Sequence, residues 1–202
     1  MDRRRRTLAA LLAVVALLLA AVLGVVLLLT SLGRDDTGTP GAAGRSTSAA
    51  APAPASIPTG YTRYDADGFS LGVPAGWKPE PVRPGVVDIR EPNSSRFLRL
   101  ITVGSTASAL DQLTAAERQF GANPDYAPYR RIRLEKVSYR SYDAAEWEFT
   151  FTSRNSLRHV LYRGVVVGGR SYGLYLSVPD GRWAESQAAF RTAADTFRPA
   201  GG

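Results

Sequence analysis

The feature that most constrains this 202-residue chain is a run of uncharged, almost wholly apolar residues from Leu8 to Leu29. At about 1.5 Å per helical residue, such a run reaches roughly 33 Å and can cross the hydrocarbon core of a bilayer. The cluster Arg3–Arg6 precedes the run, whereas Arg34, Asp35 and Asp36 follow it. By the positive-inside rule, this asymmetry predicts a cytoplasmic N-terminus and an extracytoplasmic C-terminal domain.

A cleaved signal peptide is the alternative interpretation of this run. Signal peptides have apolar cores of about 7–15 residues that end at a small-x-small cleavage site. The present run is longer, and the nearest such site, around 49–55, lies far downstream. We therefore predict a single-pass protein of the cell membrane, with a basic cytoplasmic tail at 1–7 and a retained signal anchor at 8–30. An acylated lipoprotein anchor is excluded because the sequence contains no cysteine.

Residues 31–58 are predicted to form a flexible linker. The segment consists mainly of Gly, Ala, Pro, Ser and Thr, and no large apolar residue lies between Leu32 and Ile57. A segment of this composition cannot bury a hydrophobic core. The extracytoplasmic domain is therefore predicted to span residues 59–202, a length sufficient for a core without disulfides.

The charge of that domain argues against a nucleic-acid partner. Residues 59–202 contain 19 basic and 15 acidic side chains, so they carry only about +4 of the formal net charge of +7. They contain no long basic run and no recognised nucleic-acid-binding motif. We predict no binding to nucleic acid.

From residue 59 onward, apolar and polar residues alternate with period two, which predicts β-strands. The predicted strands are 61–64, 69–73, 86–90, 97–103, 130–139, 144–152, 158–167 and 171–178. In the sixth of them, Trp147, Phe149 and Phe151 alternate with Glu146 and Glu148. This alternation predicts a sheet with one buried and one wetter face.

Two amphipathic helices accompany the predicted strands. Ser108 and Asp111 resemble a capping box, and the apolar stripe that follows ends at Phe120, before Gly121. A second apolar stripe runs from Trp183 to Phe197. Hairpin strands with segregated helices predict an α+β fold, in which an antiparallel sheet of about six or more strands is packed by two or more helices.

Few residues of the domain point to catalysis or metal binding. His159 is the only histidine and could serve a hydrolytic triad, but no G-x-S-x-G motif is present and this residue lies within a predicted strand. One histidine and no cysteine leave only carboxylates as metal ligands, and no EF-hand spacing occurs. We predict neither a metal nor a cofactor.

Glu146 and Glu148 are the remaining candidates for chemistry. They share one face of a strand about 7 Å apart, a separation that a glycosidase pair tolerates. The alternative is a solvated face on which basic residues of neighbouring strands pair with both glutamates. We prefer the second interpretation and predict no catalytic residue, so a carboxylate-based hydrolase of the envelope is the minor alternative.

The densest basic stretch of the domain contains Arg130, Arg131 and Arg133, followed by Lys136 and Arg140. In a regular strand, Arg131 and Arg133 share a face with Glu135. These arginines are candidates for binding lipid headgroups or an acidic wall polymer. The alternative is an exposed strand whose arginines pair with nearby glutamates.

Four tyrosines, Tyr126, Tyr129, Tyr139 and Tyr142, lie in or near predicted loops. A tyrosine can stack on a ligand and also form a hydrogen bond with it, so these residues are candidates for a groove that binds sugar or peptide. The alternative is that each of them packs in the core. Together with Arg130, Arg131 and Arg133, they form the predicted ligand-binding set.

Three segments of the chain carry a family resemblance: Gly68–Trp77 (GFSLGVPAGW), Ala145–Phe149 (AEWEF) and Thr196–Pro199 (TFRP). Together they resemble the extracytoplasmic C-terminal domains of actinobacterial receptor-type serine/threonine kinases. The resemblance implies a PsbP-like α+β fold over about Tyr61 to Pro199. The sequence has no Gly-rich loop, catalytic loop or Asp-Phe-Gly motif of a kinase, so kinase activity does not carry over.

These observations predict a membrane-anchored protein whose non-catalytic extracytoplasmic domain binds a ligand or a protein partner at the cell envelope. The membrane is its first predicted partner, and an anionic or cell-wall ligand or another protein is the second. The alternative is a structural or assembly factor of the envelope that presents its sheet or groove to other proteins.

Overall fold

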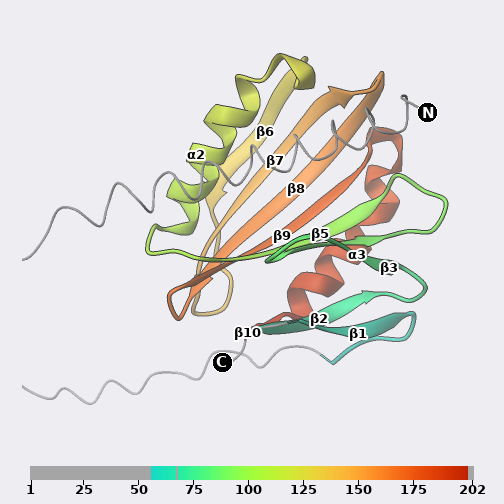
Figure 1. Ribbon diagram of the computed structural model, residues 1–202, viewed down its shortest axis with the longest axis vertical. Helices are drawn as coiled ribbons and strands as arrows, with labels where there is room; N and C mark the ends of the chain where they lie inside the picture. The colour runs from blue at the N-terminus through green and yellow to red at the C-terminus, as the bar shows by residue number, and fades with distance from the viewer. Residues whose placement is uncertain (1–55, 67, 200–202) are drawn as a thin grey trace, which may run out of the picture.

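The computed structural model describes residues 56–66 and 68–199 (Figure 1). The predicted cytoplasmic tail, signal anchor and most of the linker lie outside the described residues. Within the described part of the chain, no helix has the length and apolar character needed to cross a membrane.

The larger of two sheets is antiparallel, with the strand order β3-β4-β5-β9-β8-β7-β6. Its strands are β3 (Lys78–Arg83), β4 (Val86–Arg90), β5 (Phe97–Gly104), β6 (Tyr129–Lys136), β7 (Asp143–Ser153), β8 (Ser156–Val167) and β9 (Arg170–Pro179). The smaller sheet has the order β1-β2-β10 and is also antiparallel. Its strands are β1 (Tyr61–Ala66), β2 (Phe69–Pro74) and β10 (Arg198–Pro199).

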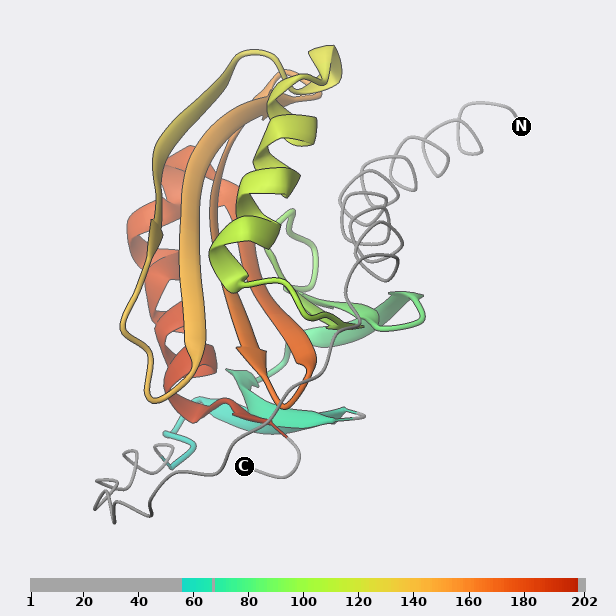
Figure 2. The ribbon, with the colours of Figure 1, turned by 90° about the vertical axis from the view of Figure 1, so that its left-hand side faces the viewer.

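Two α-helices, α2 (Ala109–Gly121) and α3 (Trp183–Thr196), cover opposite faces of the larger sheet, as Figure 2 shows. Two short 3-10 helices, η1 (Pro124–Tyr126) and η2 (Asp180–Arg182), connect these layers. The Ser108 hydroxyl accepts a hydrogen bond from the Asp111 N–H, which confirms the predicted cap. The predicted α+β class, with an antiparallel sheet of at least six strands and two helices, is confirmed.

The helix α3 also connects the larger sheet to the smaller one. One core cluster contains Phe190 and Phe197 of the α3 segment, Leu71 of β2, and Leu98 and Leu174 of the larger sheet. The smaller sheet therefore shares its core with the larger sheet, and Figure 1 shows the smaller sheet at the lower end of α3.

Strand β3 is absent from the sequence-based prediction, which has no strand between 69–73 and 86–90. Its sequence contains Pro79 and Pro81, and proline cannot donate to a β-ladder. The structure places β3 at the edge of the sheet, where it pairs only with β4 and proline is tolerated.

The prediction of one buried and one wetter sheet face is half correct. Trp147, Phe149 and Phe151 are buried beneath α2, as predicted. The opposite face is buried as well, because α3 covers part of it, and Glu146 on that face is only 4 % exposed. Alternation within one strand reveals that the two faces differ in chemistry, but it does not reveal whether a distant helix covers the polar one.

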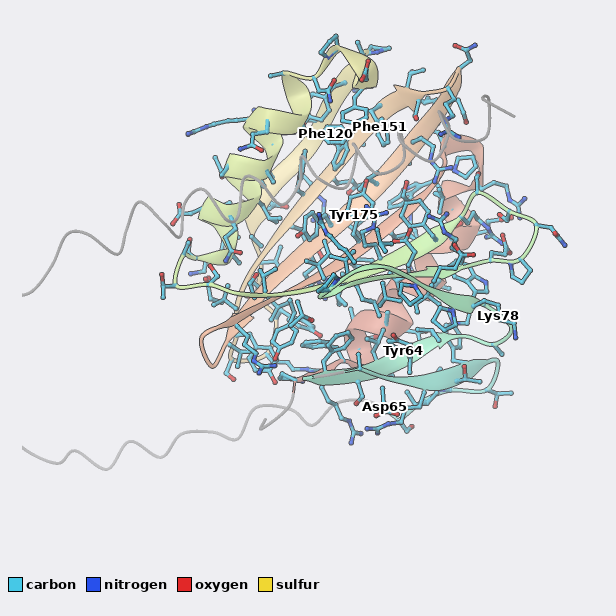
Figure 3. All side chains as sticks on the ribbon, in the orientation of Figure 1. Tyr64, Asp65, Lys78, Phe120, Phe151 and Tyr175 are labelled. Carbon is cyan, nitrogen blue, oxygen red and sulfur yellow. The ribbon has the colours of Figure 1, made fainter. Side chains whose placement is uncertain are left out.

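Phe120, at the end of α2, is the centre of an aromatic cluster. Its ring centroid lies 4.2 Å from that of Tyr126, 4.9 Å from that of Phe149 and 5.1 Å from that of Phe151. Figure 3 shows Phe120 and Phe151 together between α2 and the larger sheet. This cluster fixes α2 on the sheet because each ring pair adds edge-to-face or stacked contact to the buried area.

We expect Phe120→Ala to lower the free energy of unfolding by about 3–5 kcal/mol, because it removes a buried ring and leaves a cavity. Urea unfolding of the full chain, followed by tryptophan fluorescence, measures this loss. Leu157→Ala is the control, since Leu157 is 46 % exposed and its truncation should cost less than about 1 kcal/mol. Equal losses for the two variants would show that the Phe120 ring contributes no more to stability than an exposed leucine does.

Candidate functional site

A cluster of charged side chains lies on the α3 side of the larger sheet, where β6, β7 and β8 run side by side. Arg133 of β6 contacts both glutamates of β7: its Nη1 lies 2.6 Å from Glu146 Oε2, and its Nε lies 2.8 Å from Glu148 Oε2. Arg163 of β8 donates from Nε to Glu146 Oε1 at 2.8 Å. The sequence-based alternative, in which neighbouring basic strands pair with Glu146 and Glu148, is confirmed.

His159 joins this cluster to the start of α3. Its Nε2 lies 2.9 Å from Glu148 Oε1, and its Nδ1 lies 3.0 Å from Asp180 Oδ1 of η2. The imidazole also stacks on the Trp183 ring, with the centroids 3.7 Å apart and the planes nearly parallel. Both ring nitrogens and one ring face are therefore occupied by protein groups, an arrangement typical of a structural histidine.

The charges around Glu148 keep it ionised. Burial raises the pKa of this carboxyl, but hydrogen bonds from Arg133 and His159 outweigh burial and hold the pKa below its ordinary value. A glycosidase acid requires the opposite, a carboxyl whose pKa is raised so that it carries a proton near neutrality. The geometry thus favours an internal ion network over a catalytic carboxylate pair.

The predicted basic stripe is divided by a β-bulge in β6. The pairing with β7 shifts between Arg131, which faces Phe149, and Arg133, which faces Glu148. The prediction that Arg131 and Arg133 share a face is therefore wrong: the extra residue Ile132 turns Arg131 to the α2 side, where it pairs with Glu117. The predicted strand 130–139 also ends earlier, at Lys136.

The remaining basic residues of the stripe have different environments. Arg130 is exposed on β6, which is an edge strand of the larger sheet. Arg140 donates from its guanidinium to the carbonyl oxygens of Asp195 and Phe197, and so caps the C-terminal end of α3. Binding of an anionic ligand by Arg130, Arg131 and Arg133 stays a prediction.

The four candidate tyrosines lie on two opposite faces of the larger sheet. Tyr126 and Tyr129 pack beneath α2, and the Tyr129 hydroxyl donates to Glu117 Oε1 at 2.6 Å. Tyr139 and Tyr142 lie on the α3 side, where the Tyr139 hydroxyl donates to the Ala194 carbonyl. Burial raises the pKa of Tyr126 and of Tyr139 to about 12. The structure brings these residues together in pairs and not in one groove, and their role in ligand binding stays a prediction.

A pocket that the sequence did not indicate lies between the two sheets. It has a volume of about 380 Å³, within the range of small-molecule sites. The smaller sheet, β3, β4, β5 and β9 all contribute to it. The lining residues are Tyr64, Ala66, Phe69, Pro81, Arg83, Gly85, Val86, Val87, Leu100, Thr102 and Arg170. Figure 3 places Tyr64 on the smaller sheet, at the end of the molecule away from the Phe120 cluster.

The turn between β3 and β4 shapes one wall of this pocket. Gly85 has a φ of 73°, and a Cβ there would lie 2.4 Å from the carbonyl oxygen of Thr102. The Thr102 N–H donates to the Gly85 carbonyl at 2.8 Å. Only glycine permits this close approach, so the turn is held against β5.

The pocket contains two arginines, Arg83 and Arg170, and none of the described residues lining it is acidic. Within residues 56–66 and 68–199, neither side chain has a hydrogen-bond or ion-pair partner, and the Arg83 Nε is buried. Burial, and next the charge of Arg99, lower the pKa of Arg83. The pocket therefore carries positive charge that the described residues around it do not neutralise. No group of His, Asp and Glu in the described residues could hold a metal ion.

The comparison with family models identifies the domain. Residues 61–199 match the model described as "Serine/threonine kinase C-terminal domain". The chain belongs to this family. The match covers the folded part described above and confirms the resemblance found in the three sequence segments. No curated protein sequence matches the chain.

One solved structure supports the PsbP-like fold of this kinase C-terminal domain, and a second is reported for comparison. The solution structure of cyanobacterial PsbP (CyanoP) from Synechocystis sp. PCC 6803 has a TM-score of 0.55 and 21 % identity, and the match covers 79 % of this chain and 98 % of that one. The crystal structure of LpqN, "involved in cell envelope biogenesis of Mycobacterium tuberculosis", has a TM-score of 0.49 and 15 % identity over 68 % of this chain and 88 % of that one. At 21 % identity, the likeness to CyanoP concerns the fold alone.

We expect Glu148→Gln to cost about 1.5–3 kcal/mol of stability at pH 7, because it removes charge-assisted hydrogen bonds to Arg133 and His159. The pKa of Glu148 is lowered in the folded state, so its contribution is complete above the ordinary value of 4.5 and is lost as the pH falls through the lowered value. Urea unfolding of both proteins as a function of pH measures this difference.

Glu135→Gln is the matched control for that experiment, because Glu135 also contacts Arg133 but its side chain is 58 % exposed. We expect this variant to lose less than about 1 kcal/mol. A loss in Glu148→Gln that is equally large at pH 7 and at acid pH would show that packing, and not charge, explains the effect.

Proposed function

We propose that the chain is a single-pass membrane protein whose extracytoplasmic domain binds a ligand or a protein partner at the cell envelope and performs no catalysis. Residues 61–199 match a kinase C-terminal domain and contain no kinase catalytic motif, which supports a binding role and not a catalytic one. The single observation that carries the proposal is the contrast between two sets of charges. The carboxylates near His159 are neutralised by neighbouring arginines, whereas the arginines of the inter-sheet pocket have no ion-pair partner within residues 56–66 and 68–199.

The proposed anchor rests on the apolar run 8–29 and on the arginines before it. The linker 31–58 would then hold the domain roughly 30 Å from the bilayer on average, if it behaves as a flexible coil. A domain tethered in this way binds soluble ligands, lipid headgroups or neighbouring membrane proteins within a thin layer above the membrane.

We expect single cysteines to report this topology cleanly, because the natural sequence has none. A membrane-impermeant maleimide should label Ser156→Cys, in the exposed turn between β7 and β8, on intact cells. The same reagent should label Asp2→Cys only after lysis. Labelling of both sites on intact cells would contradict the proposed orientation, and a labelled product of reduced mass would show that the anchor is cleaved.

We expect a ligand of the envelope to raise the melting temperature of the full chain in lipid nanodiscs. Cell-wall glycan fragments are the first probe. At about 100 times its dissociation constant, a ligand stabilises the fold by about 2.7 kcal/mol, which corresponds to a rise of roughly 5–10 °C. All three tryptophans lie in the described residues, so their fluorescence reports the unfolding of the domain. Release of product from the fragments would contradict the non-catalytic role.

A further inference from the structure

The inter-sheet pocket contains an arginine with an unusual environment for this protein. Other poorly exposed arginines have ion-pair or hydrogen-bond partners: Arg99 pairs with Asp88, its Nε lying 2.6 Å from Asp88 Oδ1, Arg163 pairs with Glu146, and Arg158 donates to the Ser177 hydroxyl. Arg83 has no such partner among the described residues, although its Nε is buried. Leaving a buried N–H without an acceptor is unfavourable, so a ligand that accepts a hydrogen bond from the Arg83 Nε would stabilise the protein.

A second arginine lies on the same pocket. Arg170, at the start of β9, is exposed, and its Nη1 lies near Gly68 in the turn that joins β1 to β2. Arg83 and Arg170 thus contribute from different strands, one in the wall and one at the rim. Guanidinium groups form paired hydrogen bonds with phosphate or carboxylate oxygens, and two of them around one pocket favour an anion.

The rest of the pocket is apolar. Tyr64 and Phe69 of the smaller sheet, with Val86 and Leu100 of the larger sheet, form its walls. Phe69 and Leu100 belong to the core cluster shared by the two sheets. An inorganic anion would leave these walls without a partner, whereas an anion attached to an apolar group would cover them.

We infer that this pocket binds a small organic anion, a phosphate or carboxylate carried on an apolar or aromatic group, with Arg83 and Arg170 holding the charge. The inference rests on the proposed binding function and names the class of ligand. Two sources supply this chemistry: a free organic anion outside the cell, and the headgroup and upper chain of an anionic lipid.

A second hollow on the surface does not share these properties. It lies at the β4–β5 connection and is lined mainly by polar residues, among them Glu80, Arg90 and Glu91. There Arg90 pairs with Glu80, the Nε lying 2.8 Å from Oε2, and Arg96 pairs with Glu91. Both of these arginines are paired within the protein, whereas Arg83 and Arg170 have no partner among the described residues, which singles out the inter-sheet pocket.

The test uses the full chain in phosphatidylcholine nanodiscs and phenyl phosphate as the probe. Inorganic phosphate supplies the charge alone, and benzyl alcohol supplies the ring alone. We expect phenyl phosphate to raise the melting temperature in a saturable way, by roughly 5–10 °C at 100 times its dissociation constant. The inference would be overturned if phenyl phosphate raised the melting temperature no more than inorganic phosphate or benzyl alcohol does.

Arg83→Met separates a binding role from a structural one. The substitution removes an unpaired charge from the pocket wall, so the free protein should melt at the same or a higher temperature. Its affinity for phenyl phosphate should fall by roughly 10- to 100-fold, because charge-assisted hydrogen bonds are lost. Loss of stability together with unchanged affinity would assign Arg83 to the fold instead.

Two further variants complete the experiment. Arg170→Met changes an exposed side chain at the rim and should also weaken binding, which keeps the inference testable if Arg83→Met does not fold. Arg191→Met removes the same charge from the exposed side of α3, outside the pocket and outside the predicted ligand-binding set, and should bind phenyl phosphate normally. Equal weakening by Arg191→Met would show that net charge, and not the pocket, attracts the anion.

Phosphatidylglycerol nanodiscs distinguish the two sources. If lipid headgroups occupy the pocket, the melting temperature should rise without added probe and the apparent affinity for phenyl phosphate should fall, both effects being lost in Arg83→Met. Unchanged behaviour would assign the pocket to a free anion. If phenyl phosphate does not bind but glycan fragments stabilise the protein, the ligand class is wrong while the proposed binding function stands.

Discussion

Burial of both faces of the larger sheet is the constraint on which the rest of the structure depends. The chain has no cysteine, so no disulfide supports the fold and the packed layers must do so. The helix α2 covers one face through the ring of Phe120, and α3 covers part of the other. The helix α3 also reaches the smaller sheet, where the Thr196 hydroxyl accepts a hydrogen bond from the Gly72 N–H at 2.7 Å. The position of α3 thus sets the spacing of the two sheets.

The distribution of charge follows from these layers. On the α3 side of the larger sheet, β7 lies between two strands that each contribute an arginine. Arg133 of β6 and Arg163 of β8 both pair with Glu146 of β7. Desolvation makes such pairing necessary, because an isolated charge in a packed layer is unfavourable. A pocket remains between the two sheets, and there Arg83 has no partner among the described residues. The same principle therefore separates a structural network from a candidate binding pocket.

The sequence predicted most of the elements and little of the pocket. Alternation around Trp147 and the cap at Ser108 are local signals, and both correspond to elements of the structure. The prolines of β3 concealed an edge strand, because proline is read as a break until its place in a sheet is known. The bulge at Ile132 cannot be predicted from the sequence of β6 alone, because a bulge is defined by the pairing of β6 with β7. The pocket joins residues from β1 to β9 across more than 100 positions, so only the tertiary arrangement reveals that Arg83 and Arg170 line the same pocket.

The two edges of the larger sheet have a consequence for how a partner could recognise this domain. Along β3, Pro79 and Pro81 have no N–H to offer, and along β6 the bulge at Ile132 interrupts a regular backbone edge. An extended peptide therefore finds no continuous ladder to join at either side. At the two edges of the larger sheet, recognition must therefore depend on side-chain shape and charge, where single substitutions can change selectivity without disturbing the backbone.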